Sequence, residues 1–326
     1  MKALLCRSLG APDSLAIGQV PSPKPADDQV RIRVRACGVN FPDVLMVAGK
    51  YQLKPPMPFS PGAEVCGDIV ECGARCTRLK SGQRVIAMCG FGGMAEEVCV
   101  AETAAVPVAA SLPVETAAGF LLAYGTSYHA LKQRATLRAG ETLLVLGAAG
   151  GVGLAAVELG KLMGARVIAA ASTSPKLELA RHYGADDLVN YRDANLKESV
   201  LGLTDGRGAD VIFDPVGGDL FDHCLRAVAW NGRILVVGFA GGNIQAIPAN
   251  LPLLKGCAVV GVFWGKFVDR EPDVNRENTG QLLKYLADCR IKPHIAEVFP
   301  LDDGAKALEM LAGRKAMGKI VVRVSS

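Results

Sequence analysis

The stretch that decides the fold is Leu143-Leu144-Val145-Leu146-Gly147-Ala148-Ala149-Gly150-Gly151-Val152-Gly153-Leu154. An apolar strand leads here through a glycine loop, spaced G-x-x-G-x-x-G, into a helix. Glycines let the chain turn tightly, let the backbone approach a pyrophosphate, and let the helix pack on the strand. Free N–H groups at the start of the helix bind the anion. The loop therefore predicts a dinucleotide site, with a tight packed turn as the alternative. Its predicted contacts are Gly147, Ala149, Gly150, Gly151, Val152 and Gly153.

Strands and helices alternate around this loop from about residue 121, which predicts an α/β domain with a doubly wound parallel sheet. The predicted strands are 142–146, 166–170, 211–213, 233–237 and 257–263, and the predicted helices are 152–163, 175–183 and 218–227.

Residues 1 to about 120 are predicted to be β-rich. Residues 29–36 alternate with period two, so that Val30, Ile32 and Val34 share one face. Further strands are predicted at 64–72 and 83–88, and prolines separate them into loops. The tail is predicted to form helices at 278–289 and around 303–311 and a strand at 319–324, and it could rejoin the first domain.

The charge balance excludes an obvious polyanion binder. The 326 residues carry 36 Lys+Arg against 32 Asp+Glu, a net charge of +4 that is scattered along the chain, so nucleic acid is not expected as a partner. No signal h-region and no apolar run of about 20 residues occurs. We therefore expect a cytoplasmic protein with no membrane segment. None of the ten cysteines has C-x-x-C spacing, and we expect reduced thiols and no metal.

The cofactor is predicted from the end of the second strand of the α/β domain. An NAD-specific site usually offers Asp or Glu there to the adenine ribose. This chain has Ala169-Ala170-Ala171-Ser172-Thr173-Ser174-Pro175-Lys176. Ser172 and Lys176 can bind a 2′-phosphate that no carboxylate repels, so NADPH is predicted. The alternative for Lys176 is a solvated lysine at a helix start.

Five motifs together resemble the zinc-free branch of the medium-chain dehydrogenase/reductases, typified by NADPH:quinone oxidoreductase and zeta-crystallin. They are Cys37-Gly38-Val39-Asn40-Phe41-Pro42-Asp43, Pro61-Gly62-Ala63-Glu64, Ala123-Tyr124-Gly125-Thr126-Ser127-Tyr128-His129-Ala130-Leu131, the loop 147–153, and Asp214-Pro215-Val216-Gly217-Gly218. The resemblance implies a GroES-like catalytic domain, residues 1–122 completed by 267–326, and a Rossmann domain, residues 123–266. It places the active site in the cleft between these domains.

The zinc alcohol dehydrogenases of the same superfamily hold their metal with cysteine, histidine and a third cysteine or acid. The matching positions here are Asn40, Ala63 and, by spacing, Leu122. A catalytic zinc needs three protein ligands, so the resemblance implies chemistry without a metal. Quinones and α,β-unsaturated carbonyls suit such a site, because conjugate hydride addition spreads the developing charge.

The resemblance also implies roles for individual residues. Asn40 and Thr126 are expected near the nicotinamide. Apart from the resemblance, Tyr51 lies in the loop after the Asn40 motif, and its phenol is a candidate hydrogen-bond donor to the substrate oxygen. Asn40 is alternatively a turn residue, and Tyr51 is alternatively a packing residue or loop anchor. The remaining expected cofactor contacts are Tyr191, Val216, Phe239, Phe263, Trp264, Gly265 and Lys319, with core packing as the alternative for each aromatic side chain.

Two rival functions stay open at this stage. One is an enoyl-thioester reductase acting on acyl-CoA, which requires a basic patch that the sequence does not reveal. The other is a non-catalytic nucleotide-binding protein. In the resembled family the last Rossmann strand commonly pairs across a two-fold axis, and the apolar segment 257–263 fits that position. A homodimer is therefore expected.

Overall fold

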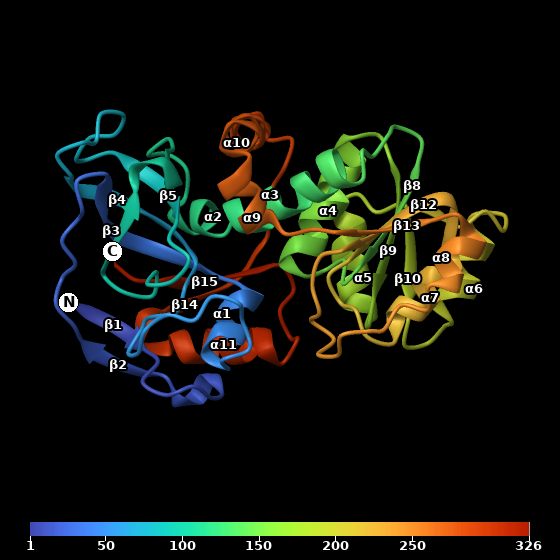
Figure 1. Ribbon diagram of the computed structural model, residues 1–326, viewed down its shortest axis with the longest axis horizontal. Coiled ribbons are helices and arrows are strands. Elements are labelled where there is room, and N and C mark those ends of the chain that lie inside the picture. The colour runs from blue at the N-terminus through green and yellow to red at the C-terminus, as the bar shows by residue number, and fades with distance from the viewer. Residues whose placement is uncertain (326) are drawn as a thin grey trace. The chain divides into compact units, whose positions relative to one another are not determined.

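The computed structural model describes residues 1–325 and divides them into two compact units (Figure 1). Unit 1 comprises Met1–Leu122 and the residues from Pro293 on, and unit 2 comprises Ala123–Lys292. The chain thus returns to unit 1 at Pro293 and not at residue 267 as expected from the sequence. The reason is that the segment before Pro293 packs within unit 2, where the Asn278 side-chain oxygen accepts hydrogen bonds from Lys132 Nζ at 3.3 Å and Gln133 Nε2 at 3.1 Å.

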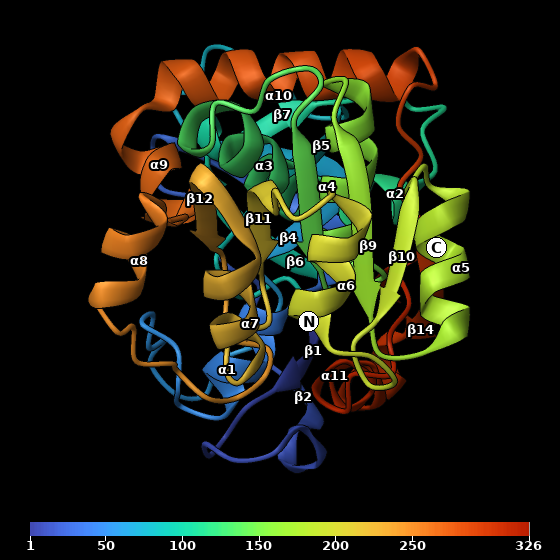
Figure 2. The same ribbon diagram turned by 90° about the vertical axis from the view of Figure 1, so that its right-hand side faces the viewer.

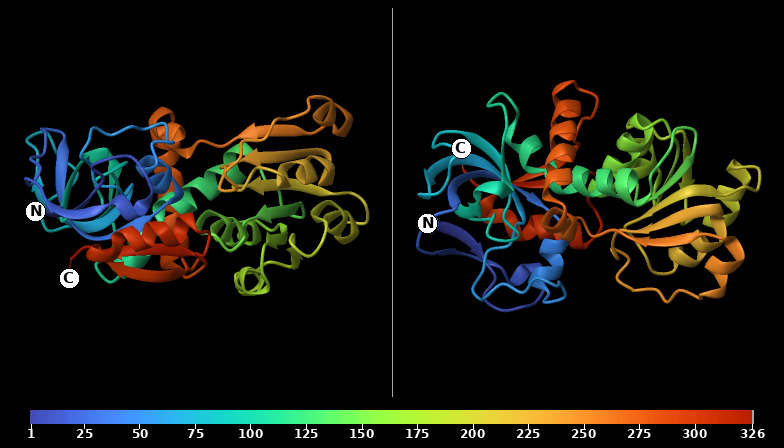
Figure 3. Two further views of the ribbon diagram at one scale, coloured as in Figure 1. Left: turned by 90° about the horizontal axis from the view of Figure 1, so that it is seen from below. Right: turned by 45° about the horizontal axis from the view of Figure 1, so that its top comes forward.

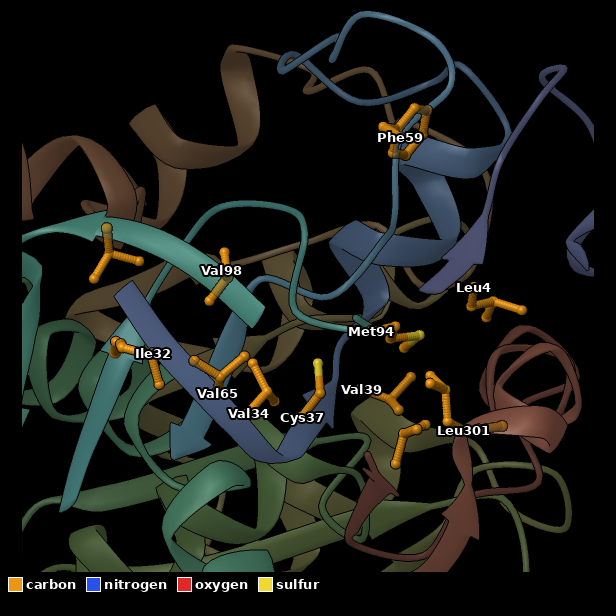
Figure 4. Packing of buried hydrophobic residues seen from close by; sticks show 14 of the residues in the cluster. Leu4, Ile32, Val34, Cys37, Val39, Phe59, Val65, Met94, Val98 and Leu301 are labelled. Atoms are coloured by element: carbon orange, nitrogen blue, oxygen red, sulfur yellow. The ribbon is translucent and has the colours of Figure 1, made fainter. Parts of the chain in front are cut away.

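Unit 1 is built on a sheet in the order β14-β15-β3-β4-β5-β7, with β6 also paired to β3. The central strand β3 (Gln29–Val39) alternates as predicted, with Val30, Ile32 and Val34 fully buried. These side chains pack with residues of neighbouring strands, such as Val65 and Val98, in one apolar core (Figure 4). The other strands from the first part of the chain are β1 (Lys2–Leu5), β2 (Ala16–Gln19), β4 (Glu64–Cys72), β5 (Arg84–Met88), β6 (Glu97–Ala101) and β7 (Ala105–Pro107), and the helices are α1 (Phe41–Val47) and α2 (Val114–Ala118).

The end of the chain completes this sheet. Strand β15 (Lys319–Arg323) pairs antiparallel with β3, so that Ile320 lies opposite Val39. On its other side β15 pairs parallel with β14 (Ile295–Pro300), and α11 (Gly304–Ala312) connects the two strands. In Figure 3 the red terminal segment joins the blue and teal strands of unit 1. The tail rejoins the first domain, as the sequence indicated.

Unit 2 is a doubly wound parallel sheet in the order β10-β9-β8-β11-β12-β13 (Figure 2). Because parallel crossovers are right-handed, α4 and α5 cover one face and α6, α7 and α8 cover the other. The strands are β8 (Thr142–Leu146), β9 (Arg166–Ala171), β10 (Asp187–Asn190), β11 (Ala209–Asp214), β12 (Val228–Val236) and β13 (Ala258–Gly261). The helices are α3 (Leu121–His129), whose first two residues belong to unit 1, α4 (Gly151–Leu162), α5 (Ser174–His182), α6 (Leu196–Leu203), α7 (Leu220–Ala227), α8 (Asn250–Lys255), α9 (Trp264–Arg270) and α10 (Pro272–Ala287).

Strand β13 is shorter and more open than the predicted 257–263. It lies at an edge of the sheet, where Ala258 and Gly261 are exposed and Val259 and Val260 are half-buried. Within residues 1–325, no helix is both long and apolar enough to cross a bilayer.

Candidate active site

In the glycine loop, backbone atoms lie so close together that no side chain fits between them. Strand β8 is fully buried, and Gly147 follows it with a left-handed φ of +56°. A Cβ on Gly153 would lie 2.2 Å from the carbonyl oxygen of Gly147. Glycine at position 153 therefore lets the start of α4 approach the turn, as the motif predicts.

The start of α4 fits the phosphates of a dinucleotide. Gly150 precedes the helix in an extended conformation, and Leu154 N donates to Gly150 O at 2.8 Å. The N–H groups of Gly151, Val152 and Gly153 belong to the first turn, whose donors have no acceptor within a helix. Together with the helix dipole, they form a ready site for an anion.

The second strand supplies groups for the adenine end of a cofactor. Ser172 follows β9 directly and is half-buried, and Lys176 lies in the first turn of α5. Tyr191 follows β10, and its N–H donates to Ala171 O at 3.2 Å, which brings it next to Ser172. The structure thus gathers Ser172, Lys176 and Tyr191 at the carboxyl ends of β9 and β10.

The turn after β11 borders the glycine loop. Asp214 Oδ1 accepts hydrogen bonds from the N–H groups of Val216 and Gly217, both at 2.8 Å. This places Val216 beside Gly147, where a Cβ on the glycine would lie 3.2 Å from Val216 Cγ2. Phe239 packs against Gly217 in the same way, since a Cβ on Gly217 would lie 3.0 Å from Phe239 Cδ1. Val216 and Phe239 therefore lie together next to the loop.

The last group of expected contacts follows β13. Phe263 is half-exposed and Gly265 is exposed, whereas the indole of Trp264 is buried against Gly125, the residue before Thr126. A Cβ on Gly125 would lie 2.6 Å from the Trp264 ring, so this position requires glycine. The Trp264 side chain is a packing residue, and only its backbone remains as a candidate cofactor contact.

In unit 1 a cluster of polar side chains is almost completely buried around Asn40. Glu64 Oε1 accepts hydrogen bonds from Asn40 Nδ2 at 2.9 Å and from Lys319 Nζ at 2.7 Å, and Glu64 Oε2 accepts one from Leu122 N at 2.9 Å. Lys319 Nζ also donates to Asn40 Oδ1 at 2.6 Å and to Val39 O at 3.2 Å. The cluster therefore joins the ends of β3, β4 and β15 to the main chain at Leu122, within unit 1.

These contacts differ from the expected roles of Asn40 and Lys319. The second Nδ2 hydrogen of Asn40 is directed to Gly38 O at 3.2 Å, so the amide has no donor left for a substrate. All three ammonium hydrogens of Lys319 are likewise directed to protein oxygens. The geometry thus favours neither a substrate contact by Asn40 nor a cofactor contact by Lys319.

Asp43 is a buried acid that the sequence argument did not assign to the site. Its Oδ2 accepts from Asn40 N at 2.8 Å and its Oδ1 from Gly62 N at 3.2 Å. Burial raises the pKa of Asp43 from 3.8 to about 7, although these hydrogen bonds and the charge of Lys319 oppose the rise. The spacing of Asn40 and Asp43, an N-cap residue with an acid three positions later, was the signal that marks this contact in the sequence.

Tyr51 lies close enough to Asp43 to be influenced by its charge. Its side chain is half-buried against the core of unit 1, and burial together with the negative charge of Asp43 raises the pKa of the phenol. The phenol therefore stays protonated at neutral pH and is able to donate a hydrogen bond.

The comparisons with known proteins agree with this arrangement. Residues 26–110 match the alcohol dehydrogenase GroES-like domain, and residues 151–279 match the zinc-binding dehydrogenase family. The chain is 43% identical to quinone oxidoreductase-like protein 2 homolog of Nematostella vectensis over 98% of this chain and 88% of that protein. It is 40% identical to quinone oxidoreductase-like protein 2 of Bos taurus over 98% and 92%.

A solved structure gives the same result for the fold. Escherichia coli quinone oxidoreductase, crystallised in complex with NADPH, superposes with a TM-score of 0.94 at 26% identity, covering 99% of this chain and all of that one. A GroES-like unit and a dinucleotide-binding unit define a medium-chain dehydrogenase/reductase. Within that class, this chain belongs to the quinone oxidoreductase family.

Proposed function

We propose that this protein is an NADPH-dependent reductase that transfers a hydride to a quinone or to an α,β-unsaturated carbonyl compound without a metal. The observation that carries the proposal is the pairing of a glycine-loop anion site with a second strand that is followed by Ser172 and Lys176 and not by an acid. The complex of the E. coli relative with NADPH supports the same cofactor.

The choice of acceptor follows from the residues at the metal-ligand positions. Asn40, Ala63 and Leu122 stand where the zinc enzymes of the superfamily have ligands, and the nearby cation is the ammonium of Lys319. Reversible alcohol oxidation needs strong stabilisation of an alkoxide. A conjugated acceptor makes a smaller demand, because its own π-system delocalises the charge.

The protein's residues bind the cofactor and donate a hydrogen bond to the acceptor. The first turn of α4 binds the pyrophosphate, and Ser172 and Lys176 bind the 2′-phosphate. NADPH, when bound, supplies the hydride. Tyr51, protonated at neutral pH, donates a hydrogen bond to the acceptor oxygen.

The deciding experiment measures NADPH oxidation in the presence of chelator with a naphthoquinone, a phenanthrenequinone, a 2-alkenal and crotonyl-CoA, with NADH as the cofactor control. Chelator-resistant turnover that prefers NADPH and a quinone or the alkenal supports the proposal. Loss of turnover with chelator contradicts the metal-free chemistry. Turnover of crotonyl-CoA alone identifies the enoyl-thioester reductase, and nucleotide binding without turnover identifies the non-catalytic protein.

We also propose that the protein is a homodimer joined through β13, and that it acts in the cytoplasm. The edge strand leaves unpaired backbone groups, a feature that proteins normally cover. Large apolar side chains are exposed on β12 and α8 beside it, with Trp230 at 70% and Leu253 at 76% exposure. Sedimentation at micromolar concentration tests the dimer, because a species of only 34 kDa contradicts it.

A further inference from the structure

Unit 1 contains a lysine, Lys319, that is only 5% exposed. We infer that Lys319 is a positioning residue whose ammonium acts as a built-in cation, fixing Asn40, Glu64 and the Leu122 segment in one geometry. The inference rests on the proposed reductase function for its kinetic readout alone. Its structural basis is the set of contacts around the lysine Nζ.

The ammonium is coordinated by three oxygens from three different groups. They are a main-chain carbonyl (Val39), a carboxamide (Asn40) and a carboxylate (Glu64), at 3.2, 2.6 and 2.7 Å. This uses every hydrogen that an ammonium can donate. The arrangement resembles the coordination of a bound cation, except that the cation is covalently part of β15.

The position of Glu64 is prepared by the surrounding backbone. A Cβ on Gly38 would lie 2.5 Å from Glu64 Oε1 and 2.3 Å from Ala118 O, so only glycine leaves room for the carboxylate. Glu64 then spans from Asn40 to the N–H of Leu122. The cation and its carboxylate thus connect two of the three positions that hold zinc in related enzymes.

The Asn40 side chain is orientated by this contact. Its Oδ1 faces Lys319, and its Nδ2 therefore faces Glu64 and Gly38 O. Asn40 is also the residue that precedes α1, and its N–H is held by Asp43. At the other end of α1, Lys50 N donates to Leu45 O at 2.7 Å, directly before Tyr51. Lys319 thereby fixes the residue that begins α1, the helix that precedes the Tyr51 segment.

Lys319 also stabilises the fold, because its positive charge balances buried negative charge. Two acids, Asp43 and Glu64, are each at most 1% exposed, and Lys319 is the cation that contacts one of them directly. A buried ion pair that loses one partner leaves an uncompensated charge, which is strongly destabilising, whereas replacing both partners by neutral groups is much less so.

The test uses Lys319→Met, Glu64→Gln, the neutral pair that combines these two changes, and Lys284→Met as a control. Lys284 also pairs with an acid, Asp288 at 3.2 Å, but on the exposed face of α10. We expect Lys319→Met to lower the melting temperature by about 10 °C. We expect kcat for a quinone to fall about tenfold, with the Kd of NADPH, measured by fluorescence titration, within twofold of wild type. The control should match wild type in all three.

The Glu64→Gln, Lys319→Met double variant distinguishes an effect of Lys319 on kcat from its effect on the melting temperature. It should recover most of the melting temperature, because no unpaired charge remains, while kcat stays low, because Asn40 Oδ1 still lacks its donor. It also provides a folded protein if Lys319→Met alone fails to fold.

Three results would overturn the inference. An increased Kd for NADPH with unchanged melting temperature and kcat would make Lys319 a direct cofactor contact. Full kcat in the neutral pair would make the lysine purely structural. Additive losses of stability in the two single variants and the pair would show that Lys319 and Glu64 are not coupled. If the wild type reduces no acceptor, the proposed function fails separately, and the stability cycle still tests the coupling.

Discussion

Replacing Gly153 with alanine should disable the cofactor site while leaving the fold intact. The added Cβ would lie 2.2 Å from Gly147 O and 3.0 Å from Ala148 Cα, both of them backbone atoms that cannot rotate away. Ordinary contacts begin at 3.4 Å, so the turn and the helix start must separate by about 1 Å. Overpacking of this kind costs about 2–3 kcal/mol.

The free-energy cost of the added Cβ should appear either as weaker NADPH binding or as a lower free energy of unfolding. If the loop relaxes in the free protein, the bound geometry carries the whole cost, and the Kd of NADPH rises about 30- to 150-fold. If the loop does not relax, the free energy of unfolding falls instead. Fluorescence titration with NADPH and chemical denaturation together measure both parts.

The matched control is Gly280→Ala. Gly280 lies inside α10 on its exposed side, and nothing lies within 4 Å of its added Cβ. This change should stabilise the protein by about 0.5–1 kcal/mol through helix propensity and leave NADPH binding unchanged. A Gly153→Ala protein with wild-type NADPH affinity and wild-type stability would refute the assignment of the loop.

Three further predictions concern the cofactor end, the donor and the buried acid. Lys176→Ala should reduce the preference for NADPH over NADH about tenfold in Kd, whereas Lys284→Ala should not; an unchanged preference would remove Lys176 from the 2′-phosphate site. Tyr51→Phe should lower kcat/KM for a quinone about tenfold without changing the melting temperature, and full activity would show that the phenol is not a donor; Tyr285→Phe is its control. Asp43 has a higher pKa folded, about 7, than its ordinary 3.8, because of burial. The stability that its protonated form contributes is therefore fully present below about pH 4 and is lost as the pH rises to about 7. Denaturation of wild type and Asp43→Asn across this range should show the wild type losing stability relative to the variant as the pH rises, and a constant difference between the two would contradict the raised pKa.

Local hydrophobic patterns were sufficient for most of the fold. The strands predicted at 142–146 and 64–72 have the same bounds in the structure. Both are long apolar or alternating runs whose partners lie on each side, so the pattern and the packing agree. The edge strand β13 is shorter than predicted, because its outer side has no neighbour to extend the ladder.

Helix α6 is a local element that the sequence argument missed. It buries only Leu196 and Val200, so its apolar pattern is weak. The sequence nevertheless marks the start of α6, because Asn195 is a typical N-cap residue and Glu198 follows three positions later. In the structure Asn195 Oδ1 accepts a hydrogen bond from Glu198 N at 3.2 Å.

The candidate site of unit 1 depends on contacts that no local pattern contains. Lys319 and Glu64 are 255 positions apart, and Lys319 and Asn40 are 279 apart. They meet because β15 pairs with β3 in one register, which is a property of the folded sheet. The sequence placed Asn40 in the site by resemblance, but its buried contacts with Lys319 and Glu64 require the tertiary structure.

The division of unit 1 between the two ends of the chain sets an order for its synthesis on the ribosome. Residues 1–122 emerge first, but β3 has no β15 beside it, and Glu64 has no lysine, until the last segment has been translated. Unit 2 is contiguous and has all its strands well before that point. During translation unit 2 can therefore fold before β15, the last strand of unit 1, has been synthesised. Until β15 is present, the incomplete unit 1 is most exposed to chaperones and proteases.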